Sequence, residues 1–571
     1  MKMKLIKKNI FYALILLLFC VQIAKGASGE PVTAVKGMVV SAQKLASEAG
    51  ISLLEAGGNA VDAAVATGFA LAVVHPSAGN IGGGGFMVVR FPDGKTTTID
   101  FREKAPLRAR RDMYLNDDGS VNPQKSRVGY LAVGVPGSVA GLCFALEKYG
   151  TKSLPEVLAP AIKLAQDGFA VTPRQARQFA GLRDRFLQFP ATAAIFLKPD
   201  GTPLGKGEIL TQKDLAKTLR MIAKQGPDAF YRGEISRLIV KQMEQNGGLI
   251  GPEDLANYSA VERKPIRGEY KGYDIISMGP PSSGGILLTE MLNVLSAAHL
   301  QAAEFNSPAY VHLLVEVMRR AFADRGKYLG DTDFVPVPVS GLLSRKYARE
   351  LWKTIDLRRA TPSKRVANVD PHLFQKESEE TTHYSVAQKD GMAVSVTTTL
   401  NGSYGCYAVV DGAGFLLNNE MDDFSAKPGS PNMFGLIQSN ANAIAPAKRM
   451  LSSMTPTIIS RDDKLFLVIG SPGGPTIINT VMEIFLNITE FNMNIRQAID
   501  APRFHHQWLP DVIQYEKNGL SEKTIQALMK IGHELKERSA IGEAQGIMYD
   551  AAKKQLLGAA DKRGEGAAVG F

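Results

Sequence analysis

The sequence predicts a layered α/β fold, and three observations support this prediction. Residues 130–370, roughly, show helical patterns separated by proline and glycine. Residues 381–400 alternate instead, with a turn at 389–391, as a β-hairpin does. An apolar run at 465–469 leads through a Gly- and Pro-rich turn into a helical stretch at 476–486. Short strands followed by helices, after a helix-rich first half, are typical of a layered α/β domain.

At the N-terminus, residues 1–26 are expected to form a signal peptide. Four lysines precede an apolar stretch at 10–21, and small residues lead to Ala27. The stretch is short for a membrane span and has the order of a secretory signal. We therefore expect an exported protein, periplasmic or secreted, with an uncleaved N-terminal anchor as the alternative. Later segments are not apolar for long enough to cross a bilayer, so we expect no stable membrane span after signal removal.

Charge and cysteine content argue against several classes of function. The formal charge is +10, but the five lysines of residues 1–26 contribute half of it. The rest of the chain has no basic block, so no nucleic-acid partner is expected. Only Cys143 and Cys406 follow the leader, which is too few for a disulfide framework and lacks zinc-site spacing. We expect no metal and no cofactor, and we expect Cys143 to be buried in a helix.

Glycine and proline divide the first half of the chain. Residues 37–74 have an Ala-rich helical pattern that breaks at 57–59, and four glycines at 82–85 precede an apolar strand at 87–91. Because no Gly-Lys-Ser/Thr follows, a phosphate loop is excluded. Close backbone packing is the expected role of these glycines, with lining of a site as the alternative. Residues 278–285 are expected to form a rigid loop with exposed donors.

The clearest helix is predicted at 307–322. Ser307 can cap it, Pro308 suits its first turn, and its apolar stripe is expected to lie in the core. The apolar pattern then lapses at 358–380, where charged residues gather around two prolines. We expect this segment to be a surface linker.

The hairpin that follows the linker carries the chemistry. Alternation places Thr381, His383 and Ser385 on one face of its first strand, and Ser395, Thr397 and Thr399 on one face of its second. A plain Thr-rich sheet is one interpretation. A cut after Glu380, however, would make Thr381 an N-terminal residue, whose own amine can act as base for its hydroxyl. The amides of Gly473 and Gly474, at the start of a predicted helix, suit a developing oxyanion.

Several segments of the chain closely resemble the γ-glutamyltranspeptidase family. The hairpin from Thr381 through Gly391 to Asn401 resembles the family signature, and residues 416–424, 451–454 and 470–474 follow in the family's order. Residues 79–86, 100–103 and 280–285 resemble its large subunit. The resemblance covers essentially the whole mature chain, which makes it far more specific than one short motif.

This resemblance implies a four-layer αββα sandwich of the N-terminal-nucleophile hydrolase type. One compact unit would be made of two chains after self-cleavage between Glu380 and Thr381. The large subunit would be residues 27–380 and the small catalytic subunit residues 381–571. By position, Thr381 matches the nucleophile that forms a γ-glutamyl ester, and Thr399 matches the hydroxyl that supports it.

The implied substrates are glutathione and other γ-glutamyl compounds, with water, an amino acid or a peptide as acceptor. Their glutamyl end has one carboxylate and one ammonium. Arg102 matches the family's carboxylate-binding arginine, whose planar guanidinium allows a two-pronged contact, and Ser452 and Ser453 match its hydroxyl partners. Asn401, Glu420 and Asp423 match the residues at the amino end.

A few positions depart from the family pattern or have no family role. Met392 stands where a small polar residue is usual, and we expect it to be an exposed turn residue. Residues 427–435 resemble a lid loop in which Phe434 replaces the tyrosine of some relatives, so we expect weaker closure and easier access of water. His383 is expected to be structural, and Cys406 is expected to be a core residue rather than a participant.

Two other functions remain open. A glutaryl- or cephalosporin-type acylase of the same fold would share the nucleophile and the oxyanion loop, and a non-catalytic exported binding protein would share the fold alone. The acid at Asp423 favours γ-glutamyl substrates, because a glutaryl chain has no amine to bind. Intact Thr381 and Thr399 argue against a binding protein.

Overall fold

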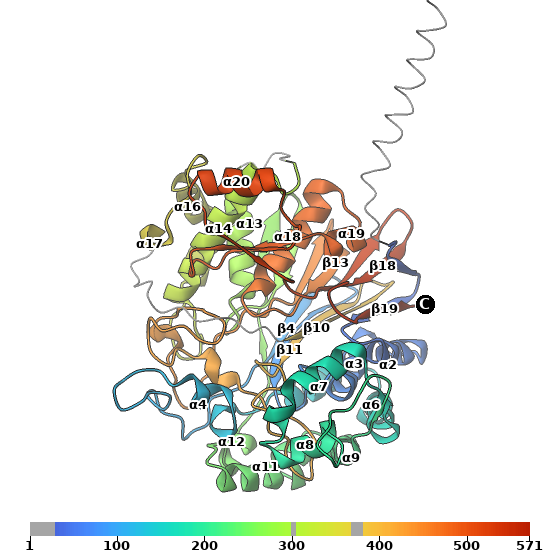
Figure 1. The fold of residues 1–571 in the computed structure, drawn as a ribbon. Coiled ribbons are helices and arrows are strands. Elements are labelled where there is room, and N and C mark those ends of the chain that lie inside the picture. Colours follow the sequence, from blue (N-terminus) through green and yellow to red (C-terminus); the bar gives the residue numbers. More distant parts are fainter. Residues whose placement is uncertain (1–28, 299–303, 367–380) are drawn as a thin grey trace, which may run out of the picture.

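The computed structural model describes residues 29–298, 304–366 and 381–571, which form two stacked seven-stranded antiparallel sheets (Figure 1). The β13 sheet has the order β1 (Val32–Ala34), β18 (Gln555–Ala560), β17 (Gln545–Asp550), β13 (Lys464–Gly470), β12 (Thr457–Arg461), β9 (Tyr273–Ser277), β8 (Ile266–Tyr270). The β10 sheet has the order β19 (Ala567–Gly570), β2 (Gly37–Ser41), β10 (Thr382–Gln388), β11 (Ala393–Thr399), β3 (Gly84–Arg90), β4 (Thr96–Phe101), β7 (Val261–Arg263).

Helices cover the outer face of each sheet. Against the β10 sheet lie α2 (Lys44–Glu55), α3 (Ala60–Val74) and α5 (Ser138–Tyr149). Against the β13 sheet lie α13 (Gly284–Ala297), α18 (Thr476–Phe491) and α19 (Ile495–Asp500), with α14 (Pro308–Tyr328) packed on α13. Apolar clusters fill both helix–sheet interfaces, and a smaller cluster lies between the sheets. The expected four-layer αββα sandwich is therefore confirmed.

The remaining elements extend these layers. Outside α3, which packs on α6, lie α6 (Leu154–Asp167), α7 (Pro173–Phe186), α8 (Pro190–Phe196), α9 (Lys213–Gln225), α10 (Asp228–Tyr231), α11 (Glu234–Gln245) and α12 (Pro252–Ala256). The other helices are α4 (Pro123–Arg127), α15 (Val339–Leu342), α16 (Arg345–Lys353), α17 (Ser363–Val366) and α20 (Glu522–Lys530), with 3₁₀ turns η1 (Tyr130–Ala132), η2 (Glu420–Asp423) and η3 (Asn440–Asn442). Two small sheets pair β14 (Phe504–His505), β15 (Ile513–Glu516) and β16 (Leu535–Arg538), and β5 (Phe169–Ala170) with β6 (Ile209–Leu210).

Local sequence explains where the main helices begin. The side chain of Asn59 accepts from the N–H groups of Val61 and Asp62, a capping box that starts α3 at the predicted break and contributes about 1 kcal/mol. Ser307 caps α14 through the Tyr310 N–H, as predicted, and the apolar stripe of that helix is buried. Within the described residues, no helix is long and apolar enough to span a membrane.

Three expectations about local structure were wrong. Residues 37–41 are strand β2, not helix, because Val39 and Val40 are buried on opposite faces of a sheet in which β2 pairs with both β10 and β19. The loop at 278–285 is buried rather than exposed, since it packs against residues 452–454. Met392 is also buried, in the apolar cluster under the β10 sheet. The predicted signal peptide and the 367–380 part of the predicted linker lie outside the described residues.

Candidate active site

The hairpin of β10 and β11 positions the predicted nucleophile. Its register pairs Thr382 with Thr398 and His383 with Thr397, as the alternation predicted. The same register continued by one residue sets Thr381 opposite Thr399. Because side chains alternate along a strand, both residues lie on the face that carries His383. That face looks into the space between the two sheets, where the Ser385 hydroxyl donates to the Gln545 carbonyl at 3.0 Å.

His383 belongs to this polar layer as a structural residue. Its ring nitrogens contact the Thr397 hydroxyl at 2.9 Å and the Ser385 hydroxyl at 3.1 Å. Burial lowers the pKa of His383 to about 3, so the imidazole is neutral near pH 7. Both ring nitrogens contact hydroxyl groups, in agreement with the prediction that His383 is structural.

The turn between β13 and α18 brings two glycines to the end of the inter-sheet layer. Gly473 and Gly474 have φ angles of 132° and 53°, which residues with a β-carbon rarely adopt. Their carbonyls accept from the first amides of α18. Their own N–H groups donate to no oxygen of the described residues, which leaves two donors available near Thr381.

The run of four glycines supports the neighbouring strand. A β-carbon at Gly83 would lie 2.0 Å from the carbonyl oxygen of Thr399, so only glycine allows this approach. Asn80 donates to the same carbonyl at 2.8 Å and accepts from the Gly83 N–H at 2.9 Å. The expected packing role of the glycines is therefore confirmed, and the contacts fix the backbone of Thr399.

One small cavity, of about 20 Å³, gathers the predicted site residues. Nine of the ten line it: Thr381, Thr399, Arg102, Asn401, Glu420, Asp423, Ser452, Ser453 and Gly474. Gly473 borders a second cavity, which Thr381 also lines. Thr381 and the glycine pair therefore lie at the junction of two cavities.

Arg102 is the centre of charge in the first cavity. It follows β4 and is fully buried, and its guanidinium pairs with Glu420 and, at 2.5 Å, with Asp423. Although burial lowers the pKa of Arg102, the attraction of Glu420, Glu103 and Asp423 outweighs it and raises the pKa. The residues predicted to bind opposite charges on a substrate thus pair with each other.

The carboxyl groups around Arg102 hold their protons more tightly than usual. Burial raises the pKa of Glu103 to about 7, against the attraction of Arg102. Burial likewise raises the pKa values of Glu420 and Asp423. Glu103 was not predicted as a site residue; its only sequence signal was its place next to Arg102.

Arg325 of α14 is a second buried arginine that the sequence reasoning missed. It lines the cavity, donating to the hydroxyls of Ser283 at 3.0 Å and Ser453 at 3.2 Å. Its Nη1 has no hydrogen-bond partner among the described residues. Burial lowers the pKa of Arg325 to about 10, with Arg102 adding to the effect and Asp423 opposing it. No local pattern marks this arginine, because only the packing of α14 brings it to the cavity.

Ser452 and Ser453 are held in place by the buried loop at 278–285. The Ser452 N–H donates to the Pro281 carbonyl at 2.8 Å, and the Ser283 hydroxyl donates to the Ser452 carbonyl at 2.7 Å. The Ser282 hydroxyl donates to the Met454 carbonyl at 2.6 Å. This loop therefore supports the site from behind.

The predicted lid segment, 427–435, closes one side of the cavity. Asn432 donates to Asp423 Oδ1 at 3.1 Å, the Met433 N–H donates to Asp422 at 2.8 Å, and Gln507 donates to the Phe434 carbonyl at 3.0 Å. The Phe434 ring lies against Gly474, within 2.8 Å of where a β-carbon would be. The effect of Phe434 on closure stays a prediction.

The two cysteines behave as core residues. Cys143 lies in α5 and Cys406 in the loop after β11, and both are buried. Burial raises the pKa of each thiol to about 12, so neither carries a thiolate near pH 7. This agrees with the expectations for both residues.

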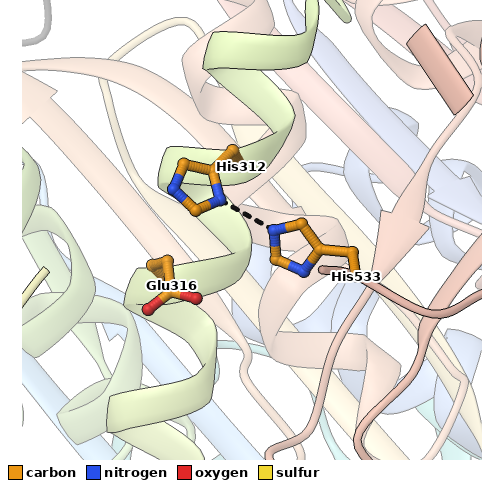
Figure 2. A group of neighbouring side chains, drawn as sticks. All are labelled: His312, Glu316 and His533. Atoms are coloured by element: carbon orange, nitrogen blue, oxygen red, sulfur yellow. Dashed lines mark hydrogen bonds between the residues drawn. The ribbon is translucent and has the colours of Figure 1, made fainter. Parts of the chain in front are cut away.

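Outside the cavity, the side chains of His312, Glu316 and His533 lie within reach of one point (Figure 2). His312 Nε2 lies 2.9 Å from the Asp356 carbonyl, which can only accept, so Nδ1 accepts from His533 at 2.7 Å. Glu316 accepts from Arg320 at 2.7 Å and from the Thr361 N–H at 2.9 Å. The atoms that would bind a metal are already used, so we describe the group as a buried network between α14 and the C-terminal region.

Known proteins resemble this chain along most of its length. A family model described as gamma-glutamyltranspeptidase matches residues 46–571. Over 534 residues the chain is 49% identical to a glutathione hydrolase proenzyme of Escherichia coli (strain K12), covering 93% of this chain and 91% of that protein.

Solved structures share the fold. The structure of a cephalosporin acylase from Bacillus halodurans superposes with a TM-score of 0.83 at 28% identity, covering 95% of this chain and 97% of that one. The structure of Helicobacter pylori gamma-glutamyltranspeptidase covers 61% of this chain and 98% of its own, with a TM-score of 0.57 and 47% identity.

Proposed function

The chain belongs to the gamma-glutamyltranspeptidase family, and from this premise we propose which residues do the work and on what. It is an enzyme of that family, an acyltransferase and hydrolase. Its substrates are glutathione and related γ-glutamyl amides, and water, an amino acid or a peptide accepts the γ-glutamyl group. The substrate is a small molecule, and no cofactor takes part.

One observation carries this proposal: Thr381 shares a cavity with buried groups of both charges. A glutamyl end has a carboxylate for Arg102 and Arg325, and an ammonium for Glu420 and Asp423. Substrate binding would exchange the ion pairs of Arg102 for these new ones. Ser452, Ser453 and Asn401 add hydrogen bonds that fix the orientation.

Catalysis follows from what surrounds Thr381. Its own α-amine takes the hydroxyl proton while Oγ1 attacks the γ-carbonyl carbon. The N–H groups of Gly473 and Gly474 stabilise the oxyanion, an effect worth about 3 kcal/mol per donor in other enzymes. The leaving amine takes the proton, and the γ-glutamyl ester of Thr381 remains until an acceptor arrives. Thr399, in register with Thr381, orients its hydroxyl.

The α-amine of Thr381 has to be released by cleavage after Glu380. Large and small subunits from one precursor are expected, because the E. coli relative is a proenzyme. We propose the ranges 27–380 and 381–571 for them. Strands on the two sides of the cut pair in both sheets: β10 with β2, β11 with β3, and β12 with β9. These pairings support one folded unit after cleavage.

We further propose that the enzyme is exported, periplasmic or secreted, after removal of residues 1–26. This rests on the leader pattern in the sequence. N-terminal sequencing of the large subunit from culture fractions tests it, and a large subunit that begins at Met1 would contradict it.

Self-cleavage is tested on a denaturing gel. Purified wild-type protein is expected to give two bands, the smaller beginning at Thr381, and Thr381→Ala is expected to give one. A wild-type chain that stays single would contradict the proposed chemistry.

The acylase alternative is favoured by the structural likeness to the Bacillus halodurans protein. Initial rates on γ-glutamyl-p-nitroanilide and glutaryl-p-nitroanilide decide between the two functions. We expect the γ-glutamyl substrate to be preferred, because Glu420 and Asp423 require an ammonium.

A further inference from the structure

A second cavity, the Glu543 pocket, adjoins the other side of Thr381. It has a volume of about 110 Å³ and is bordered by Thr381, Gly473, His75, Arg174, Glu543 and Arg563. It is therefore larger than the cavity that gathers the Arg102 group. Nothing in the chemistry described above uses its charged residues.

The geometry of acyl transfer suits the Glu543 pocket to one part of the substrate. With the glutamyl chain beside Arg102 and the oxyanion at Gly473 and Gly474, the remaining substituent of the tetrahedral carbon points away from the first cavity. That substituent is the leaving amine in the first step and the accepting amine in the second. Since Thr381 borders both cavities and Gly473 borders the Glu543 pocket, this pocket is the space next to the reacting carbon that can hold these amines.

The two arginines of the pocket differ in exposure, since only 9% of the Arg563 side chain is exposed. Arg563 pairs with Glu516 and Asp561 and also donates to two backbone carbonyls, so its guanidinium is fixed in the structure. Arg174, near the start of α7, pairs with Glu543, and 32% of its side chain is exposed. Glu543 is held by close packing, because its carboxylate occupies the place where a β-carbon at Gly564 would be.

Arg174, the more exposed of the two arginines, is therefore the cation that a ligand in this pocket can reach. His75 adds no charge beside it, since burial, reinforced by Arg174, lowers the pKa of this histidine to about 3. Glu543 is buried, and burial raises its pKa although Arg174 opposes the shift. A ligand carboxylate can share the guanidinium with Glu543, which keeps Arg174 oriented.

We propose that the Glu543 pocket binds the acceptor, and that Arg174 binds the carboxylate of an acceptor α-amino acid or short peptide. This rests on the proposed function. In the transfer step the acceptor amine attacks the ester carbonyl carbon, a C–N bond forms and the C–O bond to Thr381 breaks. The amine proton returns to Thr381 Oγ1 through the α-amine, so no co-reactant is needed.

The test compares two acceptors that differ only in the carboxylate. Rates of p-nitroaniline release from γ-glutamyl-p-nitroanilide are measured with glycylglycine and with glycylglycinamide. The wild-type enzyme is expected to have a KM for the acid ten- to a hundredfold lower than for the amide, the range for hydrogen bonds between charged groups. Arg174→Gln is expected to bring the two KM values within about twofold. Because the ratio is taken within one variant, a general loss of activity cancels.

Arg177→Gln is the matched control, since Arg177 is exposed one turn further along α7. It removes the same charge from the same helix and is expected to keep the acid preference. Arg174→Lys, which keeps the charge without the two-pronged contact, is expected to give an intermediate ratio, and it replaces Arg174→Gln if that chain does not mature.

Three results would overturn the proposal: no acid preference in the wild type, an unchanged preference without Arg174, or an equal loss in the Arg177 control. Failure of the proposed function itself looks different. In that case no variant releases p-nitroaniline, whatever acceptor is added.

Discussion

Glu103 lets the charge state of the first cavity be measured directly. It is fully buried beside Arg102, and its Oε1 receives no hydrogen bond from an N–H or O–H donor of the described residues. Glu420 Oε2 likewise receives no hydrogen bond from the described residues. Burial raises the pKa of Glu103 from 4.5 to about 7, despite the attraction of Arg102. Glu103 therefore keeps its proton to a higher pH than an exposed glutamate does.

This shift predicts the effect of Glu103→Gln on stability. The folded state holds the proton more tightly than the unfolded chain, so wild-type stability falls as the pH rises from about 4.5 to about 7. A shift from 4.5 to about 7 corresponds to about 3 kcal/mol. Glutamine has a permanent N–H donor in place of the proton, so the stability of the variant should not fall over this pH range. At pH 5 the two proteins should be about equally stable, and at pH 8 the variant should be more stable.

Thermal unfolding of the uncleaved Thr381→Ala protein measures this difference on a single chain. With an unfolding entropy of about 2 cal/mol/K per residue over 571 residues, 3 kcal/mol corresponds to a rise in Tm of about 3 °C at pH 8. Glu244→Gln, on the exposed face of α11, is the control and should show no pH-dependent difference. If Glu103→Gln shifts Tm equally at pH 5 and pH 8, the raised pKa of Glu103 is wrong.

Three further outcomes follow from the same geometry. Arg325→Met removes a cation that lines the cavity and whose Nη1 has no hydrogen-bond partner among the described residues, so the KM for γ-glutamyl-p-nitroanilide should rise ten- to a hundredfold; an unchanged KM would mean that Arg325 does not bind substrate. Phe434→Tyr adds a hydroxyl to the lid and should raise the ratio of transfer to hydrolysis with glycylglycine, whereas an unchanged ratio would refute the weaker closure. Below pH 6.5 this histidine becomes protonated in the unfolded chain but stays neutral in the folded protein, so the wild type should lose about 2 kcal/mol of stability by pH 5. The free energies of unfolding of the wild type and of His383→Gln at pH 7 and pH 5 measure this loss. An equal loss in the wild type and in the variant would argue against a lowered pKa of His383.

The hairpin could be predicted closely because its information is local. Alternation and a short turn determine which residues face each other, and they set Thr381 opposite Thr399 before any tertiary contact is known. The ordered family motifs supplied the six predicted substrate-binding residues, all of which line one cavity: Arg102, Asn401, Glu420, Asp423, Ser452 and Ser453.

What the sequence could not reveal depends on packing between distant segments. Arg325 reaches the cavity only because α14 packs on α13, and Met392 is buried only because helices cover the β10 sheet. Residues 37–41 look helical in an Ala-rich context, yet their pairing with β10 and β19 overrides that preference. In each case a tertiary contact outweighs the local pattern.

The charges of the first cavity bear on the choice between γ-glutamyl and glutaryl substrates. A γ-glutamyl end brings an ammonium as well as a carboxylate, so Glu420 and Asp423 regain a cation when Arg102 turns to the ligand. A glutaryl chain also binds Arg102 through its carboxylate, but it has no ammonium to pair with Glu420 and Asp423. Leaving a buried charge without its partner costs about 3–5 kcal/mol, although proton uptake by the acids, whose pKa values burial has already raised, recovers part of it. We therefore expect kcat/KM to favour the γ-glutamyl anilide by about a hundredfold at pH 8, with a smaller preference at pH 6, where the acids are more easily protonated. A preference that does not change with pH would show that other groups discriminate between the two substrates.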